Sequence, residues 1–97
     1  MIVEIADILV NKDRQQEFEQ AVLLAVKTIF PKAKGFEGYI FYRCIESPGR
    51  YSLQLTWSSV ENHTVDFRGS SLFTEWRALV GEFFAKPPHV EHFQSIH

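Results

Sequence analysis

Residues 56–77, which read TWSSVENHTVDFRGSSLFTEWR, decide the fold and hold most of the residues that we expect in a site. The stretch opens at the end of a strand, because aromatic and β-favouring residues alternate with polar ones up to Trp57. Ser58 and Glu61 then form a predicted capping box, which starts a short helix. Three- and four-residue spacing places on one face of this helix Val60, His63, Thr64 and Phe67. Gly69 ends it, and a second amphipathic helix follows.

Composition narrows the class of protein. The chain has 97 residues, 45% hydrophobic and 14% aromatic, which is typical of one dense globular domain over residues 1–97. A formal net charge of −2 lacks the excess of positive charge that binds nucleic acid or an anionic membrane, so neither is an expected partner. No leader-like segment is recognised, because Glu4 and Asp7 interrupt the opening apolar run. We expect Cys44 to be a buried, reduced thiol inside a strand of a cytoplasmic protein.

The rest of the chain alternates strand and helix patterns. The predicted elements are a strand over 2–10, a helix whose apolar stripe runs from Phe18 to Phe30, a hairpin of strands over 38–46 and 51–57, the short helix, a helix over 71–85 and a strand over 89–96. The order β-α-β-β-α-α-β predicts an α+β fold of the ferredoxin-like split βαβ type. In that fold the helices cover one face of an antiparallel sheet.

The first strand predicts a partner. Its apolar residues fall on both faces: Ile2, Ala6, Ile8 and Val10 on one, with Glu4, and Val3, Ile5 and Leu9 on the other, with Asp7. One layer of helices covers only one face of a sheet, so the other face needs a cover as well. A second copy is the simplest cover, which predicts a homodimer with sheets packed face to face.

Several segments resemble the antibiotic biosynthesis monooxygenase family. They are PGRY at 48–51, Trp57, ENHTVDFRGS at 61–70, FTEWR at 73–77 and PPHVEHF at 87–93, so the resemblance covers the whole chain. It implies a dimeric α+β barrel. Members of this family oxygenate quinols and polyketide anthrones without flavin, haem or metal, so the resemblance implies no cofactor and no metal site. Other members degrade haem, isomerise small signalling molecules or have no known activity.

The haem-degrading branch is similar at Trp57 but differs elsewhere. Its first-strand asparagine would fall at or beside Ala6, and its iron-ligating histidine falls near Arg77. Haem degradation is therefore disfavoured.

The residues expected in a site each have a structural alternative. The predicted catalytic residues are His63 as base or donor, Trp57 as an aromatic wall with an indole N–H, and Arg68 as the partner of an anion. The predicted substrate-binding residues are Trp57, Phe67, Phe73, Trp76, Arg77 and Glu4. The alternatives are that the aromatic residues are core, that His63 is a hydrogen-bonded structural residue, and that the arginines pair with nearby carboxylates.

Two functions fit this pattern. The first is a cofactor-independent monooxygenase that oxidises a small hydroxylated aromatic molecule with molecular oxygen. The second is a non-catalytic dimeric module of the same fold that binds a small ligand or acts in a stress response. A cavity of several hundred Å³ with converging polar groups favours the enzyme, whereas a closed dry core behind Trp57 favours the module.

Overall fold

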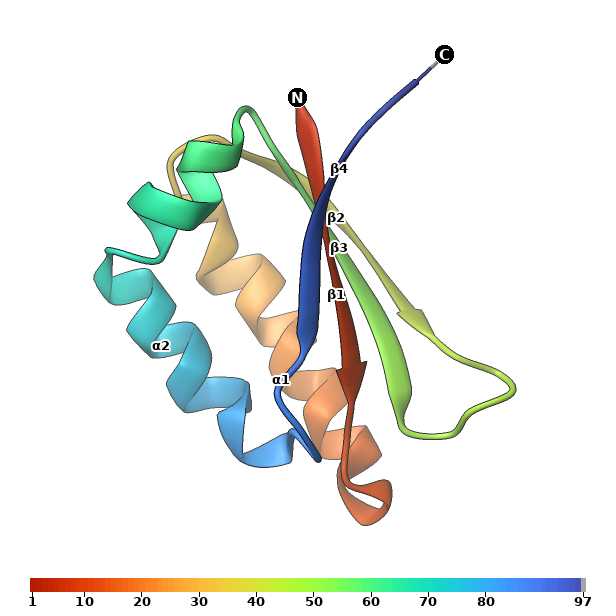
Figure 1. The fold of residues 1–97 in the computed structure, drawn as a ribbon. Coiled ribbons are helices and arrows are strands. Elements are labelled where there is room, and N and C mark those ends of the chain that lie inside the picture. The colour runs from red at the N-terminus through yellow and green to blue at the C-terminus, as the bar shows by residue number, and fades with distance from the viewer. Residues whose placement is uncertain (97) are drawn as a thin grey trace.

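Four antiparallel strands form one sheet, and both α-helices lie on the same face of it (Figure 1). The computed structural model describes residues 1–96. The strands are β1 (Ile2–Leu9), β2 (Phe36–Arg43), β3 (Arg50–Trp57) and β4 (His89–Gln94), in the spatial order β2-β3-β1-β4. The helices are α1 (Gln15–Thr28) and α2 (Ser71–Val80), with four short helical turns, η1 (Lys12–Arg14), η2 (Phe30–Lys32), η3 (Asn62–Phe67) and η4 (Gly81–Phe83). This architecture confirms the predicted ferredoxin-like α+β fold.

The core lies between α1 and the sheet. Phe18, Val22 and Ala25 of α1 have no exposed surface, which confirms the predicted apolar stripe. The Phe18 ring packs against rings from other segments, with centroid distances of 5.1 Å to Tyr51 and 6.0 Å to Phe83. Burying a side chain of this size contributes roughly 1.5–3 kcal/mol, so this cluster fixes α1 on the sheet. No helix within residues 1–96 is long and apolar enough to cross a membrane.

Several predicted boundaries are wrong by a few residues. β2 begins at Phe36, because a register irregularity lets Phe36 pair with Trp57. It ends at Arg43, so Cys44 lies beyond the strand and is half-buried, not buried inside a strand. α2 ends at Val80, because Gly81 is a poor helix former and the chain tightens into η4.

The predicted short helix is a π-helical turn with a different cap. In η3 the backbone N–H of Arg68 donates to the carbonyl of His63 (3.1 Å), a five-residue step. The predicted capping pair of Ser58 and Glu61 is wrong by one position. Ser59 N–H donates to Oδ1 of Asn62 (3.1 Å), and Asn62 N–H donates to Oγ of Ser59 (3.3 Å). The Ser58 hydroxyl instead donates to the carboxylate of Glu37 on β2.

The loop that leaves η2 fits closely around this turn. Gly35 has a φ of +80°, a backbone conformation that favours glycine, and its carbonyl accepts the N–H of Ser58 (2.8 Å). A Cβ at position 35 would lie 2.0 Å from Oδ1 of Asn62. The backbone just before β2 therefore packs directly against the Asn62 side chain of the turn that carries His63.

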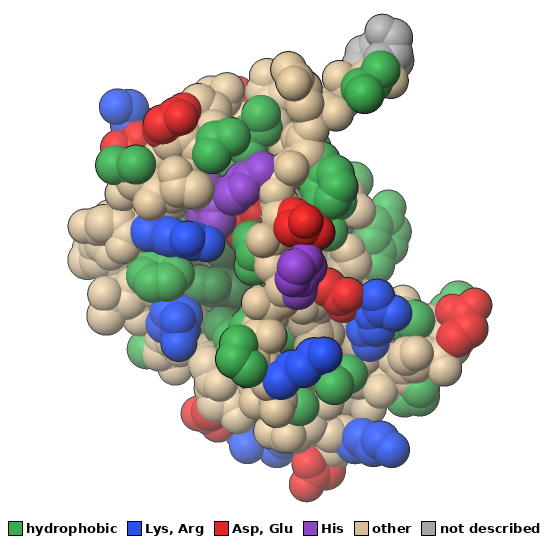
Figure 2. All heavy atoms as spheres, viewed as in Figure 1, with side chains coloured by type: hydrophobic (Ala, Val, Ile, Leu, Met, Phe, Trp, Pro, Cys, Tyr) green, Lys and Arg blue, Asp and Glu red, His purple; other side chains and the backbone are tan. Residues whose placement is uncertain are grey.

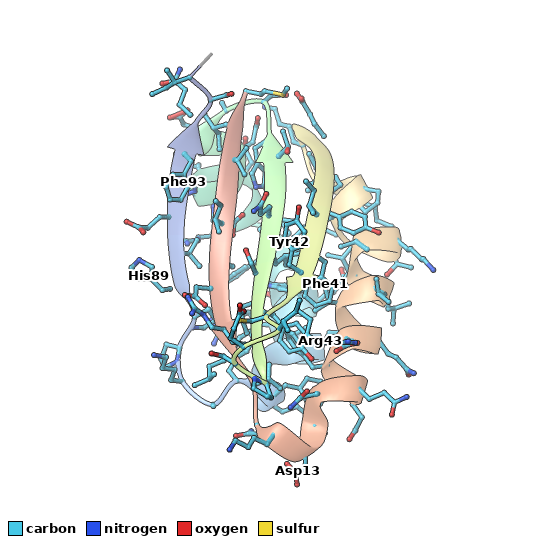
Figure 3. The ribbon with its side chains drawn as sticks, turned by 90° about the vertical axis from the view of Figure 1, so that its right-hand side faces the viewer. Asp13, Phe41, Tyr42, Arg43, His89 and Phe93 are labelled. Carbon is cyan, nitrogen blue, oxygen red and sulfur yellow. The ribbon has the colours of Figure 1, made fainter. Side chains whose placement is uncertain are left out.

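β1 lies in the middle of the sheet, with its two faces in different surroundings. Glu4, Ala6 and Ile8 are buried on the helical side, whereas Val3 and Ile5 are half-buried on the side without helices. Apolar side chains from β2 and β4 continue the open face, among them Ile40, Tyr42 and Phe93, each about half exposed. Figure 3 looks onto this face and shows Tyr42 and Phe93 on it.

We expect Gly35→Ala to lower the free energy of unfolding by about 2 kcal/mol or more. A left-handed backbone costs an alanine roughly 1–2 kcal/mol, and the added methyl group also displaces the Asn62 side chain. The matched control is Gly81→Ala, whose added Cβ meets no atom within 4 Å. Urea unfolding of both variants and the parent protein measures the difference, and a Gly35→Ala variant as stable as the parent contradicts the packing described.

Candidate functional site

A cleft of about 730 Å³ lies between the sheet, η3, α2 and the segment that leads into β4. Its floor is apolar, with side chains from β1 and β3 that include Ala6, Ile8, Leu53 and Leu55. Figure 2 shows the hollow, with hydrophobic side chains inside it and basic and histidine side chains around its rim. This volume is in the range of small-molecule sites, and it contradicts a closed core behind Trp57.

The cleft brings together nearly all of the residues predicted from the sequence. Those that line it are Glu4, His63, Phe67, Arg68, Phe73, Trp76 and Arg77. They come from β1, from η3 and the residue after it, and from α2. Apolar and polar groups are therefore both present, and the aromatic residues among them form walls as well as core contacts.

Trp57 occupies a different place from the expected wall. It has no exposed surface and lies behind the residues that line the cleft. Its indole N–H donates to Oε1 of Glu4 (3.0 Å), and its ring stacks on that of His63 with a centroid distance of 5.6 Å. The structure therefore makes Trp57 a support for the polar pair in the cleft, and its N–H is already used within the protein.

Glu4 and His63 form a buried polar pair. Nε2 of His63 lies 3.3 Å from Oε1 of Glu4, and the two residues are only 4% and 6% exposed. On its other side, Nδ1 of His63 lies 2.8 Å from Nε2 of His92 on β4. His63 thus connects the carboxyl group of β1 to a second imidazole through its two ring nitrogens.

Burial shifts both pKa values. Loss of solvent raises the pKa of Glu4 to about 7, although the Trp57 N–H and the nearby Arg68 charge favour the carboxylate. Loss of solvent also lowers the pKa of His63 to about 4, and the charge of Arg68 and the neighbouring His92 add to this effect. His63 is therefore neutral at pH 7, so its 3.3 Å contact with Glu4 is not an ion pair at that pH. Glu4 is the group that gains and loses a proton near neutral pH.

The two arginines of the cleft are available to a ligand. Within residues 1–96 neither Arg68 nor Arg77 forms an ion pair, so the alternative pairing with Glu61, Asp66 or Glu75 is not observed. The guanidinium carbon of Arg77 lies 5.8 Å from the centre of the Phe73 ring. A basic side chain over an aromatic wall can bind a planar anion.

Sequence reasoning missed two contributors. Asn62 is buried, caps η3 and donates through Nδ2 to Asp66 (3.1 Å), so it holds the turn that carries His63. His92 lies opposite Glu4 across β1 and β4 and reaches His63. The alternating pattern of β4 could have placed His92 on the helical side. Among residues 1–96, no three His, Cys, Asp or Glu side chains are grouped to hold a metal ion.

The fold and the cleft define a small α+β protein with an apolar small-molecule cleft that contains a buried carboxyl and imidazole pair. The chain belongs to the antibiotic biosynthesis monooxygenase family, whose model matches residues 1–79.

Individual proteins are similar to this chain in sequence or in fold. A candidate antibiotic biosynthesis monooxygenase from Bordetella bronchiseptica is 49% identical, covers 99% of this chain and 97% of its own, and superposes with a TM-score of 0.95. The uncharacterized protein YczJ of Bacillus subtilis (strain 168) is 38% identical, over 99% of this chain and all of its own. The monooxygenase ActVA-Orf6 of Streptomyces coelicolor shares the fold at 16% identity, with a TM-score of 0.79 over 99% of this chain and 88% of its own.

We expect the stability of the parent protein, relative to Glu4→Gln, to fall by about 2–3 kcal/mol between pH 5 and pH 8. The pKa of Glu4 is raised from 4.5 to about 7, so the folded state binds its proton more tightly than the unfolded state does. That contribution is complete below pH 4.5 and is lost as the pH rises through 7, at about 1.4 kcal/mol per pH unit. Urea unfolding at both pH values and one protein concentration measures it. Parallel pH profiles of the two proteins would contradict the raised pKa.

Proposed function

We propose that this protein is a cofactor-independent monooxygenase that oxidises a small hydroxylated aromatic molecule, such as a quinol, an anthrone or a polyketide-like compound, with molecular oxygen. The observation that carries the proposal is the apolar cleft of about 730 Å³, in which an acid–imidazole pair and two arginines converge. The family of the chain supports it. So does the fold shared with ActVA-Orf6, a monooxygenase whose structure contains the ligand nanaomycin D.

The protein does not have to supply a reductant for this reaction, because the substrate itself is the reductant. A deprotonated quinol or anthrone can donate an electron to oxygen. In an anthrone, a methylene carbon loses two hydrogens and becomes a carbonyl, while the second oxygen atom leaves as water. The protein must bind the aromatic ring, accept the first proton and stabilise the resulting anion.

Each of these tasks has residues in the cleft. Phe67, Phe73 and Trp76 offer aromatic surface against which a planar substrate can stack. The pair formed by Glu4 and His63 can accept one proton, since Glu4 titrates near neutral pH and His63 is neutral there. The guanidinium groups of the two arginines can stabilise a phenolate or enolate that forms beside them.

Haem degradation is not part of this proposal. Ala6 and Arg77 both line the cleft, at or near the positions where the haem-degrading branch has an asparagine and a histidine. An alanine offers no hydrogen bond there, and an arginine offers no ligand to iron.

We expect His63→Ala to reduce oxygen uptake by about 100-fold or more at equal folded fraction, because general acid–base help contributes about 10²–10⁴ in rate. The measurement is oxygen consumption by the parent and the variant with a panel of quinols and anthrones. His89→Ala is the control, since His89 is exposed and lies outside the cleft.

Two results would contradict the proposal. An unchanged rate in His63→Ala removes this residue from the mechanism. No uptake by the parent on any aromatic compound, together with saturable binding of those compounds, supports the non-catalytic small-ligand module instead.

We also propose that the protein acts as a homodimer through the open face of the sheet. Val3 and Ile5 of β1 lie in the middle of this face, and Ile40, Tyr42 and Phe93 extend it across the neighbouring strands. An apolar sheet face of this extent is typical of a surface that packs against another sheet. A second copy brings the same face and buries both.

We expect the protein to sediment as a dimer at micromolar concentration. The interface of this dimer should bury at least about 1,000 Å². Phe93→Lys should shift the protein toward monomer, because a charge buried in an apolar interface is costly. The control is Leu24→Lys on the outer side of α1, where the parent residue is 50% exposed, compared with 48% for Phe93. A parent protein that sediments as a folded monomer would overturn this part of the proposal.

A further inference from the structure

Three ionisable side chains form a continuous line from the cleft to the edge of the sheet. Oε1 of Glu4 lies 3.3 Å from Nε2 of His63, and Nδ1 of His63 lies 2.8 Å from Nε2 of His92. Glu4 and His63 line the cleft, whereas His92 is half-buried on the edge strand β4 and does not line it. The first two side chains are nearly buried, at 6% and 4% exposed, and the third lies at the outer end of the line.

We propose that Glu4, His63 and His92 form a relay that carries a proton between the floor of the cleft and solvent at the edge strand β4. The register of the sheet sets the line, because Glu4 and His92 are direct partners across β1 and β4. Trp57 holds the inner end through its bond to Glu4. The His63 ring faces Glu4 with one nitrogen and His92 with the other, as proton transfer requires.

The relay has two neutral-imidazole end states that differ by one proton. In the first, Glu4 is a carboxylate, His63 carries its proton on Nε2 and donates to Glu4, and His92 carries its proton on Nε2 and donates to His63. A proton taken up at Nδ1 of His92 lets its Nε2 proton pass to Nδ1 of His63. The Nε2 proton of His63 then passes to Glu4. In the second state Glu4 is protonated, and both rings carry their proton on Nδ1.

The surroundings favour this neutral relay over an imidazolium. The titratable or charged groups around Glu4 are His63 of η3, Arg68 after η3, His92 of β4, and Arg77 and Lys86 on the rim of the cleft. Burial lowers the pKa of His63 to about 4, and the Arg68 charge and the neighbouring His92 add to this effect. Burial raises the pKa of Glu4 to about 7, so the carboxyl end of the line exchanges its proton near neutral pH.

The use of the relay in catalysis rests on the proposed function, whereas its existence does not. A planar ligand that fills the cleft excludes water from Glu4, so a proton that the substrate gives up needs a route that does not cross the cleft. The route through His63 and His92 leads to the edge strand β4, because His92 does not line the cleft. Its test follows protons rather than turnover, so the relay and the oxidation can fail separately.

The experiment is ¹⁵N NMR of the histidine ring nitrogens, recorded on the folded parent protein between pH 5.5 and pH 8.5. Nitrogen shifts distinguish the two neutral tautomers from each other and from the imidazolium. We expect both His63 and His92 to move from the Nδ1-protonated to the Nε2-protonated tautomer with one shared midpoint near pH 7, where Glu4 titrates. The carboxyl ¹³C shift of Glu4 should report the same midpoint.

Three variants make the result decisive. Glu4→Gln keeps a hydrogen-bonding group at the inner end but no titrating one, so the joint tautomer change should disappear. His92→Phe should hold His63 in the Nε2 tautomer, because a proton on Nδ1 would have no acceptor. His89→Gln is the matched control, because His89 lies on the same strand but pairs with Glu91 (2.9 Å), and it should leave the change intact.

The relay is overturned if the rings titrate independently, if either ring keeps one tautomer while Glu4 titrates, or if the joint change survives in Glu4→Gln. A folded His92→Phe variant in which His63 still switches removes His92 from the relay. If that variant does not fold, the comparison of Glu4→Gln with His89→Gln still decides the question.

Discussion

A carboxyl group buried between an indole and an imidazole is the constraint on which this end of the molecule depends. A charge placed in a protein interior costs several kcal/mol unless donors surround it, so Glu4 requires partners from two other segments. Trp57 supplies one from the last residue of β3, and His63 supplies the other from η3. The strand end and the π-helical turn are thereby fixed relative to β1, and the cleft takes its shape from this arrangement.

The elements of the fold follow from periodicity, and the sequence predicts them well. The apolar stripe of α1 and the alternation of β1 identify these elements, because their spacing reports which side is buried. The π-helical character of η3 is not visible in the same way, since His63 and Phe67 share a face in either kind of helix. The position of the cap, at Ser59 rather than at the predicted Ser58, is also not visible in the sequence. Both serines fit the motif, and contacts with the loop before β2 decide between them.

The chemistry of the site is less accessible to sequence reasoning. Alternation places Glu4 and Trp57 on the helical side, but their hydrogen bond depends on a strand register between residues more than fifty positions apart. His92 belongs to the site for the same reason, through its pairing with β1. Burial then decides which group titrates, and it selects Glu4 rather than the histidine that composition alone would favour.

The close fit between Gly35 and Asn62 has a consequence for how related sequences can vary. The side chain of Asn62 occupies the space that a Cβ at position 35 would need, so these two positions form one steric unit. A larger residue at position 35 is compatible with the fold only when position 62 becomes smaller, and the cap of η3 is then lost as well. Relatives are therefore expected to keep the glycine and the asparagine together or to exchange both at once. That covariation would be readable in an alignment as a link between the start of β2 and the turn that carries the imidazole.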